Sequence, residues 1–216
     1  MALDLINLKF STAKNILREG DVLLFRGRGL VSAFIRRAGE GCYTHVGVAS
    51  RYCPKDCRLE DFIWECVEFR EWKGGRSVNL ERYVNANPGI IDVFRPSSSR
   101  NIIDLKSGLP IEQEIVFDGY KVTSIMRKMT GLPYGWRRIR WIAQHKIPFL
   151  RLFYSLESVV DDGNKQPIYP VCSSAVAYAF SQVNYDLTHH RADEYMEPSD
   201  VARSALLHYV FTLQAD

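Results

Sequence analysis

The sequence predicts a single domain that combines strands with helices. Its 216 residues are 46% hydrophobic, which is enough for one sizeable core. Short apolar segments bounded by glycine alternate with segments in which apolar residues recur at helical spacing. Proline fixes its own backbone and pushes the preceding residue toward extended geometry. We therefore expect a helix that begins near Cys172, after an extended lead-in that ends at Pro170.

The N-terminal half is predicted to hold most of the strands. Apolar or alternating segments bounded by glycines predict strands over residues 21–26, 43–49, 62–69 and 89–95, with extended structure over 76–80. Helical spacing predicts short helices over 11–18, 30–37 and 81–84. These segments are too short to bury an apolar face alone, so we expect them to share one core.

The C-terminal half is predicted to be mainly helical. Residues 96–100 form the clearest linker, and 111–129 show an irregular helical pattern. Residues 136–154 are basic and amphipathic, so they can contact a membrane surface or a lipid-like substrate, or pack on the domain with a solvated basic face. A helix from Pro198 and a strand over 208–213 complete the chain.

The composition does not favour a nucleic-acid-binding or a membrane-spanning protein. The 28 basic and 25 acidic residues give a net charge of +3, which does not favour nucleic-acid binding. The sequence has no apolar run long enough for a transmembrane helix, and its first residues do not resemble a signal peptide. We therefore expect a cytoplasmic setting, with the five cysteines reduced.

Cys172 is the candidate nucleophile. In the first turn of a helix, unpaired N–H groups and the positive end of the helix dipole favour an anion. A thiol at such a position is shifted toward the thiolate, which is the reactive form. The alternative interpretation is a small buried cysteine, as free cysteines usually are.

His45 is the candidate base. Along the strand predicted over 43–49, His45 shares one face with Gly47 and Ala49. This face has little bulk beyond the imidazole, so the helix that carries Cys172 could approach it closely. The alternative is a histidine that is simply buried in the core.

Glu65 is the candidate orienting residue. It interrupts an otherwise apolar face of the strand predicted over 62–69, and a buried carboxylate requires a partner such as an imidazole N–H. Glu68, on the opposite face, is the second choice. Cys172, His45 and Glu65 together form a possible triad of nucleophile, base and orienting carboxylate.

Several short motifs occur in an informative order. They are Gly20–Phe25, Thr44–Val48, Trp64–Cys66, Leu132–Tyr134, Val171–Ser174 and Pro198–Ala202. With the histidine and glutamate strands before the cysteine helix, the chain resembles the circularly permuted NlpC-type papain-like cysteine hydrolases. Within that family it is most similar to the YiiX-like proteins, and it is distantly similar to lecithin retinol acyltransferase.

The resemblance implies a papain-like α+β fold over residues 1–216, in which the cysteine helix packs against an antiparallel sheet. It implies a thiol hydrolase, peptidase or amidase, that forms an acyl-enzyme on Cys172 with His45 as base and Glu65 as orienting residue. The substrate would be a peptide, another amide or a lipid ester, and a lipid acyltransferase of the same fold is the alternative. No cofactor is expected. Residues 136–165 depart from the compact family pattern and are predicted to be a helical insertion.

Two other functions remain open. Cys42, His45, Cys53 and Cys57 provide four soft ligands within a short stretch, which is a possible zinc set. Against zinc, Cys42 and His45 are three residues apart in an extended region and would point to opposite faces. Zinc binding would also remove His45 from catalysis. The third possibility is a non-catalytic binding or structural module of the same fold.

Overall fold

The computed structural model describes residues 6–27, 41–54, 62–86, 89–103, 108–136, 170–187 and 196–216. Its strands are β1 (Asn7–Lys9), β2 (Val22–Arg26), β3 (His45–Tyr52), β4 (Ile63–Arg70), β5 (Gly74–Asn79), β6 (Ile90–Pro96), β7 (Ser99–Ile103), β8 (Pro110–Glu114) and β9 (Leu207–Gln214). Its helices are α1 (Phe10–Ala13), α3 (Leu80–Ala86), α4 (Gly119–Lys128), α6 (Cys172–Ser181) and α7 (Pro198–Ala202).

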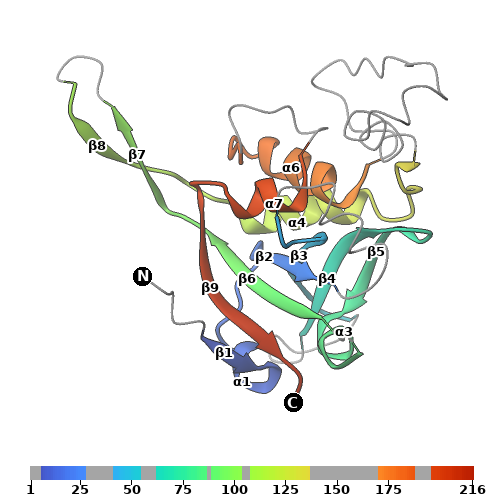
Figure 1. Ribbon diagram of the computed structural model, residues 1–216. Coiled ribbons are helices and arrows are strands. Elements are labelled where there is room, and N and C mark those ends of the chain that lie inside the picture. The colour runs from blue at the N-terminus through green and yellow to red at the C-terminus, as the bar shows by residue number, and fades with distance from the viewer. Residues whose placement is uncertain are drawn as a thin grey trace.

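Seven of these strands form one sheet in the order β1-β9-β6-β2-β3-β4-β5 (Figure 1). Within the described chain, β1 and β9 pair in parallel and the other neighbours pair antiparallel. The central strand β2 is buried on both faces, which explains its continuous apolar sequence. The fold is therefore a mixed one, built on a mostly antiparallel sheet.

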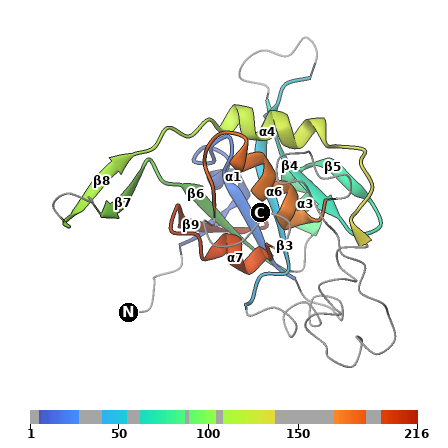
Figure 2. The ribbon, with the colours of Figure 1, turned by 90° about the horizontal axis from the view of Figure 1, so that it is seen from above.

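Helices cover both faces of this sheet. Helices α4, α6 and α7 lie on one face (Figures 1 and 2), and α1 and α3 contribute to the core on the other. The two cores follow strand alternation: Val46 and Val48 of β3 face α6, whereas Ala49 faces the α1 and α3 side. The cysteine helix α6 packs against β3 and β4, as the resemblance implies.

The structure confirms several elements close to their expected bounds. Strands β2, β3, β4, β6 and β9 occupy the segments predicted for them, and α3 covers the short helix expected at 81–84. Helix α6 begins at Cys172, and α7 begins at Pro198. The predicted helix over 11–18 is wrong in length, because α1 ends at Ala13 and turns follow.

The segment between β6 and α4 differs from prediction. Residues 99–103 and 110–114 form the β7–β8 hairpin, which projects from the sheet (Figure 1), where we expected a linker and the start of a helix. Ile111 and Ile115 are four residues apart and mimic a helical stripe, but every residue of β8 is exposed. With no core beneath them, these residues are held by pairing with β7. The predicted helix is confirmed only in its second half, as α4.

Two expected segments lie largely or wholly outside the described residues: the helix over 30–37 and the insertion over 136–165. Among the described residues, the structure contains no helix that is long and apolar enough to cross a membrane.

Candidate active site

The start of α6 positions Cys172. Val171 is extended and Cys172 is the first helical residue, so the side chain lies where the helix N–H groups have no partner in the preceding turn. The Ser174 hydroxyl accepts a hydrogen bond from the Val171 backbone N–H at 3.0 Å and fixes this end of the helix. Cys172 is a free, buried cysteine that packs within the core between α6 and the sheet.

His45 is the first residue of β3, and its ring is buried. Its Nε2 lies 2.6 Å from Oε2 of Glu68 on β4. The ring of Phe25, the residue paired with His45 on β2, lies 5.1 Å from the imidazole between ring centroids. A carboxylate and an aromatic ring from the two neighbouring strands therefore fix the orientation of the imidazole.

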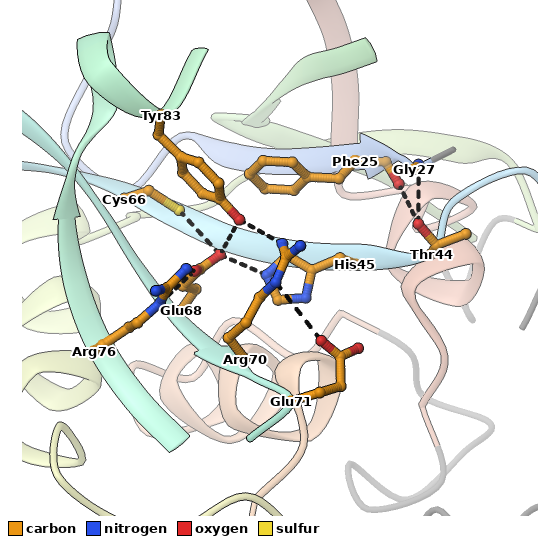
Figure 3. A network of polar contacts seen from close by, with 10 residues as sticks. All are labelled: Phe25, Gly27, Thr44, His45, Cys66, Glu68, Arg70, Glu71, Arg76 and Tyr83. Atoms are coloured by element: carbon orange, nitrogen blue, oxygen red, sulfur yellow. Dashed lines mark hydrogen bonds and ion pairs between the residues drawn. The ribbon is translucent and has the colours of Figure 1, made fainter. Parts of the chain in front are cut away.

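Glu68 is fully buried and surrounded by donors (Figure 3). Arg76 of β5 donates to Oε1 from Nε at 2.8 Å and from Nη2 at 2.6 Å. The Tyr83 hydroxyl of α3 donates to Oε2 at 2.9 Å, and the Cys66 thiol approaches the same oxygen at 3.9 Å. Because a buried carboxylate is costly without partners, this network is what keeps Glu68 ionised next to His45.

The network shifts the pKa values of both members of the pair. Burial alone would raise the pKa of Glu68, but the charge and hydrogen bond of His45, and then those of Arg76, lower it to about 2. Burial alone would lower the pKa of His45, but the negative charge of Glu68 and the interaction with Cys172 raise it well above 6.5. Both shifts favour an imidazolium–carboxylate pair inside the protein.

The second ring nitrogen of His45 is the one available to the thiol. Nδ1 is buried and has no hydrogen-bond partner at normal geometry among the residues that the structure describes. Cys172 nevertheless interacts with the imidazole closely enough to raise its pKa. Thiol and imidazole are thus neighbours without an ideal hydrogen bond between them. Such loose geometry does not argue against a catalytic pair, because these hydrogen bonds often tighten only when substrate binds.

Glu65 does not occupy the position that we expected. It accepts a hydrogen bond from Ser77 at 2.5 Å and forms an ion pair with Arg127 of α4 at 2.7 Å. Strand β4 pairs Glu68 with Gly47 and Glu65 with Ser50, so Glu68 shares the face of His45 and Glu65 lies on the other. The structure therefore brings together Cys172, His45 and Glu68, and Glu65 helps to hold α4 on the sheet.

We expected α6 to approach the strand face beside Gly47, but side chains of β4 lie there instead. A Cβ atom at Gly47 would lie 2.6 Å from Sγ of Cys66 and 3.2 Å from Cβ of Glu68. The missing side chain therefore admits β4 side chains, whereas α6 packs on the opposite face.

Gly47→Ala should lower the free energy of unfolding by about 1–3 kcal/mol, because the new methyl group overlaps buried atoms. The change is measured by urea unfolding. Cys66→Ala in the same chain removes the nearest atom and should recover part of the loss. If Gly47→Ala left the stability unchanged, this close packing would be contradicted.

The four residues considered as zinc ligands are not all free to bind a metal ion. Cys53 is disulfide-bonded, so it does not offer a thiolate, and it also departs from the reduced state that we expected. Cys42 is free and exposed, whereas His45 is buried against Glu68. Cys57 lies outside the described residues. Within the described parts of the chain, no group of three or more His, Cys, Asp or Glu residues is arranged to hold a metal ion.

Three residues that support the site were not assigned a role from the sequence. Arg76 and Tyr83 fix Glu68, and only the pairing of β4 with β5 and the packing of α3 bring them there. Tyr134 packs in the core next to Cys172. The sequence feature that could have identified Tyr134 is its position in the Leu132–Tyr134 motif.

Comparison with known proteins adds information on the fold. No protein-family model matches the sequence, and no curated protein matches it. The structure is similar to the crystal structure described as metalloprotein yiiX from Escherichia coli, with a TM-score of 0.52. The two chains are 14% identical, and the match covers 89% of this chain and 96% of the other. The chain therefore has a YiiX-like fold, and at this identity the likeness concerns the fold alone.

Proposed function

We propose that the protein is a thiol hydrolase of the permuted papain-like type, acting on an amide or ester through an acyl-enzyme on Cys172. The observation that carries this proposal is the buried Glu68–His45 pair beside a thiol at the first turn of a helix. The order of these residues along the chain and the YiiX-like fold support the same assignment.

Each residue has a defined part in the proposed reaction. The proton of Cys172 resides on His45, as the imidazolium that Glu68 stabilises, and the sulfur attacks the acyl carbonyl. The negative oxygen that forms is stabilised by N–H groups at the start of α6. As the bond to the leaving group breaks, His45 returns the proton to that group and a thioester remains. Glu68 holds the ring and stabilises its charged form.

Water completes the cycle. His45 removes a proton from water, the hydroxide attacks the thioester, and the acid product leaves while the sulfur regains its proton. An alcohol in place of water would make the same site an acyltransferase. The thioester is therefore the intermediate to detect.

Incubation with p-nitrophenyl acetate should acetylate Cys172 and give a burst of p-nitrophenolate. Cys172→Ala should abolish the burst, because it removes the attacking sulfur. Intact mass and peptide mapping locate the thioester, and its loss in buffer without an added alcohol distinguishes hydrolysis from transfer. Cys42→Ala is the matched control, since Cys42 is a free but exposed thiol that should not contribute. A burst that survives Cys172→Ala would contradict the proposal.

A further inference from the structure

Three aromatic side chains form a continuous line from the core to the surface. The ring of Tyr134 lies 5.3 Å from that of Trp136, and Trp136 lies 4.4 Å from Trp72, between ring centroids. Exposure rises along the line: Tyr134 is 7% exposed, Trp136 40% and Trp72 86%. The two indoles contact each other directly and present their outer surfaces to solvent.

This line ends at the proposed nucleophile. The Gly135 backbone N–H donates to the carbonyl of Pro170 at 3.0 Å, which joins the aromatic segment to the residues just before Cys172. Tyr134 packs in the same core cluster as Cys172. Burial raises the pKa of Tyr134, and interaction with Cys172 adds to that rise. The buried end of the line is therefore adjacent to the sulfur.

The turn that carries Trp72 is fixed to the same segment. Gly74 has a positive φ of 67°, and a Cβ atom there would lie 2.2 Å from the carbonyl oxygen of Leu132. Gly75 N–H donates to that oxygen at 2.9 Å, and Gly131 N–H donates to the Gly75 carbonyl at 2.8 Å. Trp72 is thus held near Trp136 by backbone contacts at the β5 end of the β4–β5 turn.

The backbone conformation and the exposure of Trp72 are both energetically unfavourable. It has a positive φ of 64°, which non-glycine residues rarely adopt, and its large apolar ring is mostly in water. Neighbouring Arg70 and Glu71 pair with each other at 3.7 Å, so they add no net charge to this surface. Lys73, the next residue, is exposed and adds one positive charge beside the ring. The exposed indole itself favours a flat partner that can stack on it.

We propose that Trp72 and Trp136 bind an aromatic ring of the acyl substrate, attached close to the carbonyl that Cys172 attacks. This inference rests on the proposed function and specifies its substrate: an acyl group with an aromatic side chain.

The test compares two alkylating substrate analogues, N-acetyl-phenylalanyl and N-acetyl-alanyl chloromethyl ketone. In each, the sulfur of Cys172 displaces chloride to form a thioether, and the thiol proton goes to His45. The phenylalanyl reagent should inactivate the protein about 10-fold faster, measured as the second-order rate of Cys172 alkylation. Trp72→Ala should bring this ratio close to one, and Trp72→Phe should restore most of it.

Iodoacetamide provides the control, because it is too small to reach the indoles while it reacts with the sulfur. Its rate at Cys172 should be the same within about twofold in the wild type and in Trp72→Ala. A normal iodoacetamide rate without preference for the phenylalanyl reagent would overturn the aromatic site alone, as would a preference that survives Trp72→Ala. Failure of iodoacetamide to react with Cys172 in the wild type would overturn both proposals.

Discussion

Replacing Glu68 with alanine should lower the free energy of unfolding by about 3–5 kcal/mol, the usual cost of removing one partner from a buried ion pair. The substitution leaves the His45 imidazole and the Arg76 guanidinium without their carboxylate. Urea unfolding followed by tryptophan fluorescence measures the change. Glu65→Ala is the matched control: its partner Arg127 is partly exposed, so the loss should be only about 1 kcal/mol. Equal losses for the two variants would contradict this assignment.

The same pair predicts how stability depends on pH. The pKa of Glu68 is lowered from 4.5 to about 2, so its contribution is complete above pH 4.5 and is lost as the pH falls toward 2. The pKa of His45 is raised from 6.5, so its contribution is complete below pH 6.5 and is lost as the pH rises through the raised value. The stability difference between wild type and Glu68→Gln should therefore be greatest between pH 4.5 and 6.5.

Replacing His45 with alanine should slow formation of the thioester on Cys172 by about 10²–10⁴-fold, the usual contribution of a general base. The burst with p-nitrophenyl acetate measures the rate. His45→Gln can keep a hydrogen bond to Glu68 but cannot take the thiol proton, so it should be equally slow. His208→Ala is the control, because His208 lies on β9 and contacts Ser97. A full burst in His45→Gln would exclude His45 as the base.

Strand alternation predicted the faces of the site correctly but not its carboxylate. It placed Glu65 and Glu68 on opposite faces of β4, and the structure agrees. Alternation within one strand does not tell which face meets His45, since that depends on the register between β3 and β4. Gly47 pairs with Glu68, and this register brings the second choice, not the first, to the imidazole.

The cysteine helix was predictable for a local reason. Pro170 and the small apolar residues after it encode an extended segment followed by a helix, and α6 begins at Cys172. The β7–β8 hairpin was not predictable in the same way. Strand β8 is exposed throughout and β7 is at most half-buried, so the apolar pattern that identifies core strands is missing. Their mutual pairing defines these strands. Arg76 and Tyr83 likewise reach Glu68 only through tertiary packing.

The order of the strands bears on when the proposed nucleophile can be activated while the chain is being synthesised. His45, Glu68 and Arg76 lie on the consecutive strands β3, β4 and β5, which leave the ribosome early and pair as neighbours. Strand β9, which lies between β1 and β6, is made after α6. The proposed base and its carboxylate can therefore meet before Cys172 has been translated. We expect a nascent chain to carry no activated nucleophile until α6 docks onto a sheet whose acid–base pair is already in place.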